Sequence, residues 1–166
     1  MGFLLNWYNN SYFLYRPIHA AAIEGHFEIY KLIIKNNKDV NPANNCGQSP
    51  LHFAAENGHL DLVKFIIKSI NYKNPKGLNG DTPFHLAAKN GHVEICRIIM
   101  NYVDDAAPIN KDMKTPFHYA AENGHLPMCQ LLVQCTKYNS ISDKKGYTPL
   151  QLAIKNNHFP IGNLIF

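Results

Sequence analysis

The sequence predicts an all-α solenoid in which a helix–turn–helix unit with a hairpin loop is repeated along the chain. Three observations support this: one motif returns every 33 residues, prolines mark its register, and glycines mark where each first helix ends. The prolines that mark the register are Pro17, Pro50, Pro83, Pro116 and Pro149. A fixed period of this length indicates stacked units, none of which can bury its apolar face alone.

The first helix of a unit follows from the residues that begin and end it. In residues 49–81, Ser49 is a suitable N-cap and Pro50 takes the first helical position, where its missing N–H group does no harm. Small alanines on the apolar face allow neighbouring helices to approach closely. Gly58 is expected to end the helix in the left-handed conformation. The same slot holds Gly25, Gly91, Gly124 and, in the last copy, Asn157.

The second helix is predicted to start near His59, because a broad apolar stripe follows with Asp61 and Lys64 between its members. Pro127 takes the slot of Asp61 in a later copy, within the first helical turn, where proline is tolerated. A loop then returns the chain to the next proline. Asn79-Gly80 predicts a tight turn in that loop.

The motif Thr-Pro-Phe-His-Leu-Ala-Ala-Lys-Asn-Gly-His at residues 82–92, with close copies at 49–59 and 115–125, resembles the ankyrin repeat. The resemblance extends over about residues 15–166. It implies first helices that line a concave surface, second helices on the convex side, and hairpin tips that project beside the concave face. It divides the chain into a degenerate N-terminal cap or partial repeat at 1–15 and an array at 16–166, with repeats near 16–48, 49–81, 82–114, 115–147 and an incomplete 148–166.

Some positions depart from the family pattern. Met113 replaces a hairpin glycine, and Arg16 and Gln151 break the motif in the outer copies. Residues 71–78 lack the usual hairpin residues, so we expect a distorted finger there. Asn41 stands in the Asp-Val-Asn context in which hairpin asparagines of the family can be hydroxylated, so the resemblance makes it a candidate for that modification.

All nine histidines occupy two repeat slots. The first slot follows the Pro-apolar pair, and the second follows the helix-ending position. The first holds His19, His52, His85 and His118, and the second holds His26, His59, His92, His125 and His158. The resemblance implies that the first set bonds the capping hydroxyl and backbone, and that the second braces the turn between helices and the hairpin. Because copies stand a repeat apart while zinc ligands must lie about 2.0–2.3 Å from the ion, we expect neither a metal site nor a cofactor.

The sequence offers no catalytic template. A phosphate-binding glycine loop, a serine elbow and a His-Glu-x-x-His pair are all absent. Glu56 and Glu122 share a first-helix slot with Lys89 and Lys155. This alternation of sign favours a patterned binding surface over a carboxylate pair for acid–base work, so we expect no enzyme.

The slots that vary between copies are the candidates for partner contact. They lie in the hairpins and on the first helices, where ankyrin domains bind their partners. The candidates are Asn45, Gln48, Glu56, Leu78, Asp81, Lys89, Lys111, Lys114, Glu122, Lys144 and Tyr147. Leu78 and Tyr147 are the best anchors, since apolar and aromatic side chains often dominate interface energy. The alternative for any one of these surface positions is that its residue varies without serving a function.

Composition limits the setting and the class of partner. A hydrophobic content of 46%, a charged content of 17% and a net charge of +4 with acids and bases interspersed fit a folded protein with a mixed surface, so no nucleic-acid partner is expected. No apolar run is long enough to insert in a membrane. Cys96 and Cys129 share the core slot of Val63, and no C-x-x-C motif occurs, which predicts an intracellular, cytoplasmic protein with reduced thiols.

Together these features predict a non-catalytic adaptor that binds a protein partner through its concave face and hairpin tips. The alternative is an ankyrin regulatory segment of a larger protein such as a kinase, a ubiquitin ligase or an ion channel. The apolar stripe at 163–166, with no polar hairpin after it, leads us to expect either a longer array or a partner that covers this end, and it favours the alternative. Nothing in the sequence identifies the partner.

Overall fold

The computed structural model describes residues 15–37, 39–71, 73–105, 107–135 and 140–165. Of the predicted N-terminal cap, only Tyr15 falls within these residues. The helices are α2 (Pro17–Ile23), α3 (Phe27–Lys35), α4 (Pro50–Glu56), α5 (Leu60–Ser69), α6 (Pro83–Lys89), α7 (Val93–Met100), α8 (Pro116–Glu122), α9 (Leu126–Cys135), α10 (Pro149–Lys155) and α11 (Phe159–Gly162), followed by the 3₁₀ turn η1 (Asn163–Ile165). No strand occurs among the described residues.

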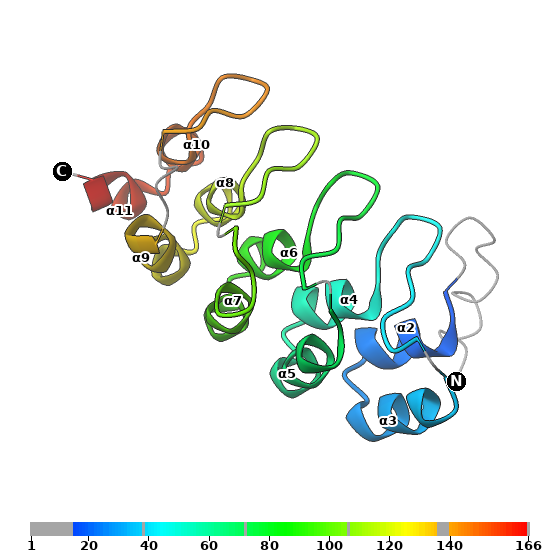
Figure 1. Cartoon of the computed structure of the whole chain (residues 1–166). Helices are drawn as coiled ribbons and strands as arrows, with labels where there is room; N and C mark the ends of the chain where they lie inside the picture. Colours follow the sequence, from blue (N-terminus) through cyan, green and yellow to red (C-terminus); the bar gives the residue numbers. More distant parts are fainter. Residues whose placement is uncertain (1–14, 38, 72, 106, 136–139, 166) are drawn as a thin grey trace, which may run out of the picture.

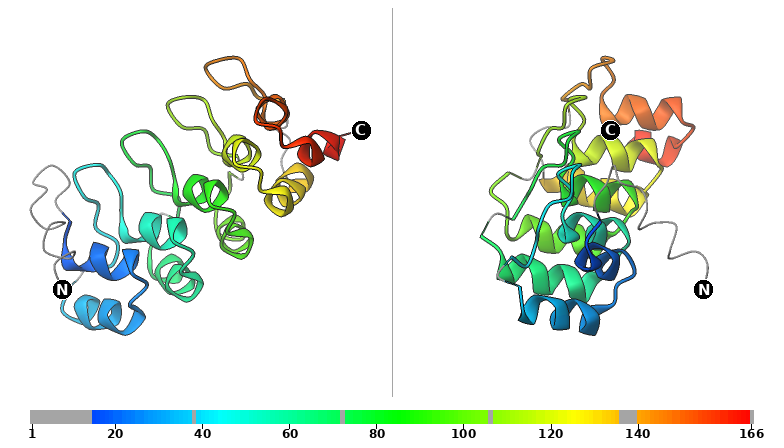
Figure 2. Two further views of the ribbon diagram at one scale, coloured as in Figure 1. Left: turned by 180° about the vertical axis from the view of Figure 1, so that it is seen from behind. Right: turned by 90° about the vertical axis from the view of Figure 1, so that its right-hand side faces the viewer.

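The helices form two parallel rows, in which successive repeats stack side by side from the N-terminal to the C-terminal end of the described chain (Figure 1). One row holds the first helices α2, α4, α6, α8 and α10, and the other holds the second helices α3, α5, α7, α9 and α11. The loops that enter α4, α6, α8 and α10 project as long fingers, all in the same direction (Figures 1 and 2). We number the repeats by their first helices and count each finger with the first helix that it enters, so α2 belongs to the first repeat, residues 39–48 and α4 to the second, and α10 to the fifth. These structural repeats begin with the finger, whereas the sequence repeats begin at the residue before each proline. The predicted all-α solenoid is confirmed.

The core lies between the two rows and is continuous along the stack. The alanines of the first helices are fully buried, which lets consecutive first helices pack closely: Ala54, Ala55, Ala87, Ala88, Ala120 and Ala121. The second helices contribute larger side chains, such as Ile66, Ile67 and Ile99. Cys96 and Cys129 are also fully buried, as their shared slot predicted.

The turn between the two helices of a repeat depends on a left-handed residue. Gly91 has φ +74°, and a Cβ built there would lie 2.8 Å from Nδ1 of His125, so both the backbone and the space require glycine. Asn157 takes the same slot in the fifth repeat with φ 64°, and Met113 replaces the finger glycine with φ 57°. These observations confirm the predicted helix terminator.

The finger that was expected to be distorted closes at its tip like the others. The Gly77 N–H donates to the Asp81 carbonyl at 2.8 Å, and the Gly80 N–H donates to the Gly77 carbonyl at 2.8 Å. The next finger shows the same pair of bonds between Asn110 and Lys114 and between Met113 and Asn110. The tip of this finger is therefore not distorted, because backbone bonds and Gly80 close the turn without the usual side chains. The expectation for the rest of residues 71–78 stays a prediction.

Candidate functional site

The first set of histidines ties each first helix to the base of the following finger. His85 shows the geometry: its Nδ1 accepts from the Thr82 N–H at 3.1 Å, which places the proton on Nε2, and Nε2 donates to the carbonyl of Lys114 at 3.0 Å. His52 and His118 make the equivalent bonds to the carbonyls of Asp81 and Tyr147, both at 3.2 Å. The bonds to the cap and backbone that the resemblance implied are present.

The second set of histidines holds the end of the first helix in the preceding repeat. In each case Nε2 faces a backbone carbonyl: His59 that of Ile23 at 2.7 Å, His92 that of Glu56 at 3.0 Å, His125 that of Lys89 at 2.8 Å and His158 that of Glu122 at 3.2 Å. These carbonyls belong to the varying first-helix slot. The two histidine sets therefore fix the backbone at the base of the fingers and at the ends of the first helices, where most candidate residues lie.

Burial keeps the first histidine set neutral. Desolvation lowers the pKa of His52 to about 4, and it also lowers the pKa values of His19, His85 and His118. Because their nitrogens are occupied by the backbone, these rings serve the scaffold. Within the part of the chain that the structure describes, no group of three or more His, Cys, Asp or Glu side chains is placed to hold a metal ion.

The candidate residues fall into three rows along the stack. The fingertip row consists of Asn45, Leu78, Lys111 and Lys144, all of which are exposed. The finger-base row consists of Gln48, Asp81, Lys114 and Tyr147, all of which are partly buried. The helix-end row consists of Glu56, Lys89, Glu122 and, in the fifth repeat, Lys155; its lysines are exposed and its glutamates partly buried.

The structure brings four of these residues together around Tyr119, which sequence reasoning did not select. The Tyr119 hydroxyl donates to Oδ1 of Asp81 at 3.2 Å, and Nδ2 of Asn110 donates to the same oxygen at 2.8 Å. Burial and the Asp81 carboxylate both raise the pKa of Tyr119, with burial the larger cause. Asp81 is therefore held by two neighbours and is not a free carboxylate.

Two lysines lie over the same ring. The ammonium of Lys114 is 5.3 Å and that of Lys89 is 5.9 Å from the Tyr119 ring centroid. Lys114 also forms an ion pair with Glu122, and their side chains are only 18% and 35% exposed. Lys89, Lys114 and Glu122 thus form one cluster around Tyr119, whereas Asn45 lies in the second repeat and Lys144 in the fifth.

A signal for Tyr119 was present in the sequence. Its slot in the first helix holds Phe53, Leu86 and Leu152 in other copies, so Tyr119 alone among them adds a hydroxyl. A second signal was the finger residue Asn110, whose slot is Asn44, Gly77 and Asp143 elsewhere. Both slots vary between copies, but the sequence does not show which residues of a neighbouring repeat they contact.

The asparagine in the Asp-Val-Asn context has a structural bond. The Asn41 Oδ1 accepts from the Leu51 N–H at 2.9 Å, and the Asn41 N–H donates to Oδ1 of Asp39 at 3.0 Å. Asn41 thereby links the finger that enters α4 to that helix. The recurring helix-end asparagines also bond backbone carbonyls; Asn90, for example, donates to the carbonyls of Glu56 and Leu86 at 3.1 Å.

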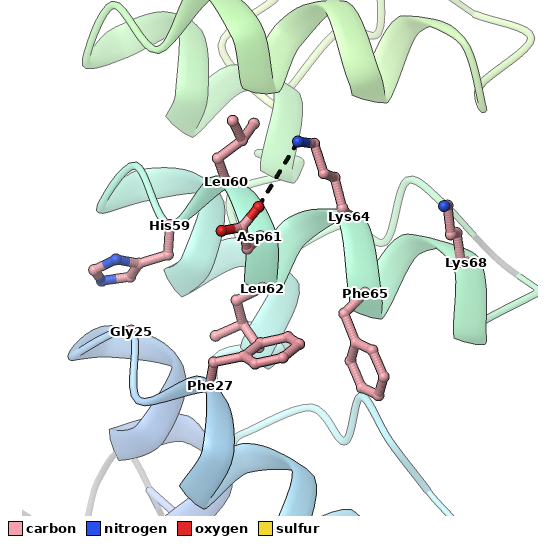
Figure 3. Close-up of a pocket in the computed structure, with 9 residues that line it drawn as sticks. All are labelled: Gly25, Phe27, His59, Leu60, Asp61, Leu62, Lys64, Phe65 and Lys68. Carbon is pink, nitrogen blue, oxygen red and sulfur yellow. Dashed lines mark ion pairs between the residues drawn. The ribbon is translucent and has the colours of Figure 1, made fainter.

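A groove also lies on the side of the second helices, between α3 and α5 (Figure 3). Phe27 and Phe65 pack edge to face there with ring centroids 5.4 Å apart. Asp61 and Lys64 on its rim form an exposed ion pair at 3.7 Å. The groove follows the packing of neighbouring second helices and gathers no convergent polar groups.

No helix in the described ranges is long and apolar enough to cross a membrane. A family model for ankyrin repeats in three copies matches residues 68–140 and 105–166, and a model for ankyrin repeats in many copies matches residues 18–67. No curated protein matches the chain.

Proposed function

Because the chain belongs to the ankyrin-repeat family, we propose that it is a non-catalytic module that binds a protein partner through its concave face and fingertips. Ankyrin repeats are in general protein–protein interaction modules. The described thiols of Cys46, Cys96 and Cys129 are unpaired, which supports a reducing, intracellular setting for this role.

The observation that carries the proposal is a varied set of side chains on a uniform backbone. The finger-base row changes from amide to carboxylate to ammonium to phenol between Gln48 and Tyr147, and the helix-end row alternates between glutamate and lysine. Three carbonyls of each row are held by the same kind of histidine bond in successive repeats: those of Asp81, Lys114 and Tyr147, and those of Glu56, Lys89 and Glu122. Variation on a fixed frame is what recognition of a specific partner requires.

The fingers are also fixed to one another. The Leu78 N–H donates to the Cys46 carbonyl at 2.7 Å, the Lys111 N–H to the Asn79 carbonyl at 2.9 Å, and the Lys144 N–H to the Asp112 carbonyl at 2.9 Å. These bonds form a ladder across the four fingertips. A surface ordered before binding loses less conformational entropy on association, which favours affinity.

The fingers carry apolar side chains that can act as anchors. Leu78 is 58% exposed at a fingertip, and Ile109 and Met113 of the next finger are both 45% exposed. Exposed apolar groups at the end of a rigid finger can enter pockets of a partner and supply much of the interface energy. Tyr147, the other predicted anchor, is partly covered by Lys155.

Two variants of matched composition test the proposal. One replaces Leu78, Lys111 and Lys144 on the fingers with serine, and the other replaces Leu32, Lys64 and Lys68 on the second helices with serine. Each removes one exposed leucine and two exposed lysines. Asp81 and Lys114 are left unchanged because both have internal partners.

Proteins captured from cells by the unaltered chain are compared quantitatively with those captured by each variant. We expect a set of proteins that the second-helix variant retains and the finger variant loses, while circular dichroism shows that both variants fold. If the finger variant keeps the whole set and the second-helix variant loses it, the concave face is not the binding surface.

A further inference from the structure

The finger-base and helix-end rows compensate each other's charge in the third and fourth repeats. In the third repeat the two slots hold Asp81 and Lys89, and in the fourth they hold Lys114 and Glu122. The second pair is a direct ion pair between Lys114 and Glu122. Each of these repeats therefore supplies a carboxylate and an ammonium at the same two places.

The fifth repeat breaks this compensation. Its finger-base slot holds Tyr147 and its helix-end slot holds Lys155, whose ammonium lies 4.2 Å from the Tyr147 ring centroid. Lys155 is exposed and forms no ion pair with a carboxylate of the described residues. A cation over an aromatic ring at an exposed site is only weakly stabilised, and its charge is not neutralised.

The rest of the fifth finger adds positive charge. Lys144 and Lys145 are exposed at its tip, and Lys111 is exposed at the tip of the finger before it. The carboxylate of Asp143 is buried, and its Oδ1 accepts from the backbone N–H groups of Lys145 and Tyr147 at 2.9 Å. The two last fingers and the end of α10 thus carry four exposed lysines, Lys111, Lys144, Lys145 and Lys155, but only one exposed carboxylate, that of Asp112.

The opposite end of the concave face differs in charge. In the second repeat the equivalent fingertip, finger-base and helix-end slots hold Asn45, Gln48 and Glu56, with no lysine among them. The apolar fingertip of Leu78 follows in the third repeat. The face therefore runs from neutral or acidic, through apolar, to basic along the stack.

Resting on the function proposed above, we propose that the partner presents an acidic polypeptide segment to the fifth repeat. A partner carboxylate binds the Lys155 ammonium beside the Tyr147 ring, where it supplies the negative charge that Glu122 supplies in the fourth repeat. Further acidic side chains of the segment reach Lys111, Lys144 and Lys145. Such pairing selects the partner and its orientation along the concave face.

The test is selection from a random-peptide display library on the full chain, followed by measurement of affinity for the selected peptides. One variant carries Lys144→Glu and Lys155→Glu. The matched control carries Lys64→Glu and Lys68→Glu on α5, which changes the net charge equally on the other side of the molecule. A short single-stranded DNA oligonucleotide is measured in parallel as a different polyanion.

We expect the selected peptides to be acidic, to bind more weakly as salt rises, and to lose at least about tenfold in affinity for the Lys144/Lys155 variant but not for the control. Neutral or basic peptides that still depend on finger residues would overturn this inference and leave the proposed function standing. Peptides insensitive to every finger variant would count against both. A selection without enrichment, or tighter binding of the oligonucleotide than of any peptide at physiological salt, would also overturn the inference.

Discussion

The two histidine sets are uniform from repeat to repeat, whereas the finger-base and helix-end rows whose backbone they bond change in every repeat. His52, His85 and His118 are fully buried and make the same bonds in three consecutive repeats. Their acceptors belong to Asp81, Lys114 and Tyr147, which have nothing in common as side chains. The histidines bond only the backbone of these residues.

This difference separates the residues that stabilise the fold from those that we propose bind the partner. A carbonyl oxygen accepts the same hydrogen bond whatever side chain its residue carries. The side chains of the finger-base and helix-end rows can therefore change without weakening the frame. Substitutions in the frame should change stability strongly, and substitutions in the varied rows should change it little.

The largest loss of stability is expected at the turn between the two helices of a repeat, where a new side chain has no space and the backbone must be left-handed. We predict that Gly91→Val destabilises the fold by more than about 3 kcal/mol, because the left-handed conformation is strained for a β-branched residue and the new side chain displaces His125 from the Lys89 carbonyl. Thermal and urea unfolding measure the loss.

Gly146→Val is the matched control for that variant. Gly146 has φ +83°, but a Cβ built there meets nothing within 4 Å. It therefore isolates backbone strain from the contact with the histidine. If Gly146→Val costs as much stability as Gly91→Val, the histidine contact contributes nothing and the account of the frame is wrong at this turn.

The second effect is a dependence of stability on pH. Burial lowers the pKa of His52 to about 4, whereas an unfolded histidine titrates near pH 6.5. The unfolded state thus binds more protons between these values, so stability is complete above about pH 6.5 and falls as the pH drops towards 4. His52 alone accounts for a loss of about 3 kcal/mol over this range. Urea unfolding at a series of pH values measures the slope.

His52→Gln separates this titration from other acid effects. The fifth repeat already uses glutamine in this slot: Oε1 of Gln151 accepts from the Thr148 N–H at 2.9 Å. The substitution keeps the acceptor for the Ser49 N–H and removes the group that titrates. We expect a shallower loss of stability between pH 6.5 and 4. An unchanged slope would show that His52 does not titrate as its burial requires.

The smallest effect concerns a difference between two fingers. Oδ1 of Asn110 accepts from the N–H groups of Asp112 and Lys114 at 2.9 Å, whereas Gly77 has no side chain to do the same. We predict that Gly77→Asn stabilises its finger by about 1 kcal/mol and slows amide exchange at Asn79 and Asp81. The Cβ has room, since its nearest neighbour is 3.5 Å away. Faster exchange in the variant would contradict this reading.

The fold could be predicted from the sequence because every local signal repeats. The Pro50 and Pro83 helix starts, the Gly58 and Gly91 ends and the alanine faces all agree, and each is confirmed. The regular tip of the finger that includes residues 71–78 could not be predicted from side chains, because backbone bonds close it.

The site could be predicted only as a set of positions. Periodicity showed which slots vary, but contacts between repeats are not visible in a single repeat. Asp81 contacts Tyr119 across 38 residues, and Asn110 reaches it across 29. These contacts make Asp81 an internal hydrogen-bond acceptor as well as a candidate for partner binding. The partner-binding role of all the candidates stays a prediction.

The measurement that most directly tests the separation of frame from recognition is amide exchange with and without a captured partner. The account predicts added protection in the fingers, at residues 45–48, 78–81, 111–114 and 144–147, and unchanged exchange in α5, α7 and α9. Protection confined to those second helices, with the fingers unchanged, would contradict it.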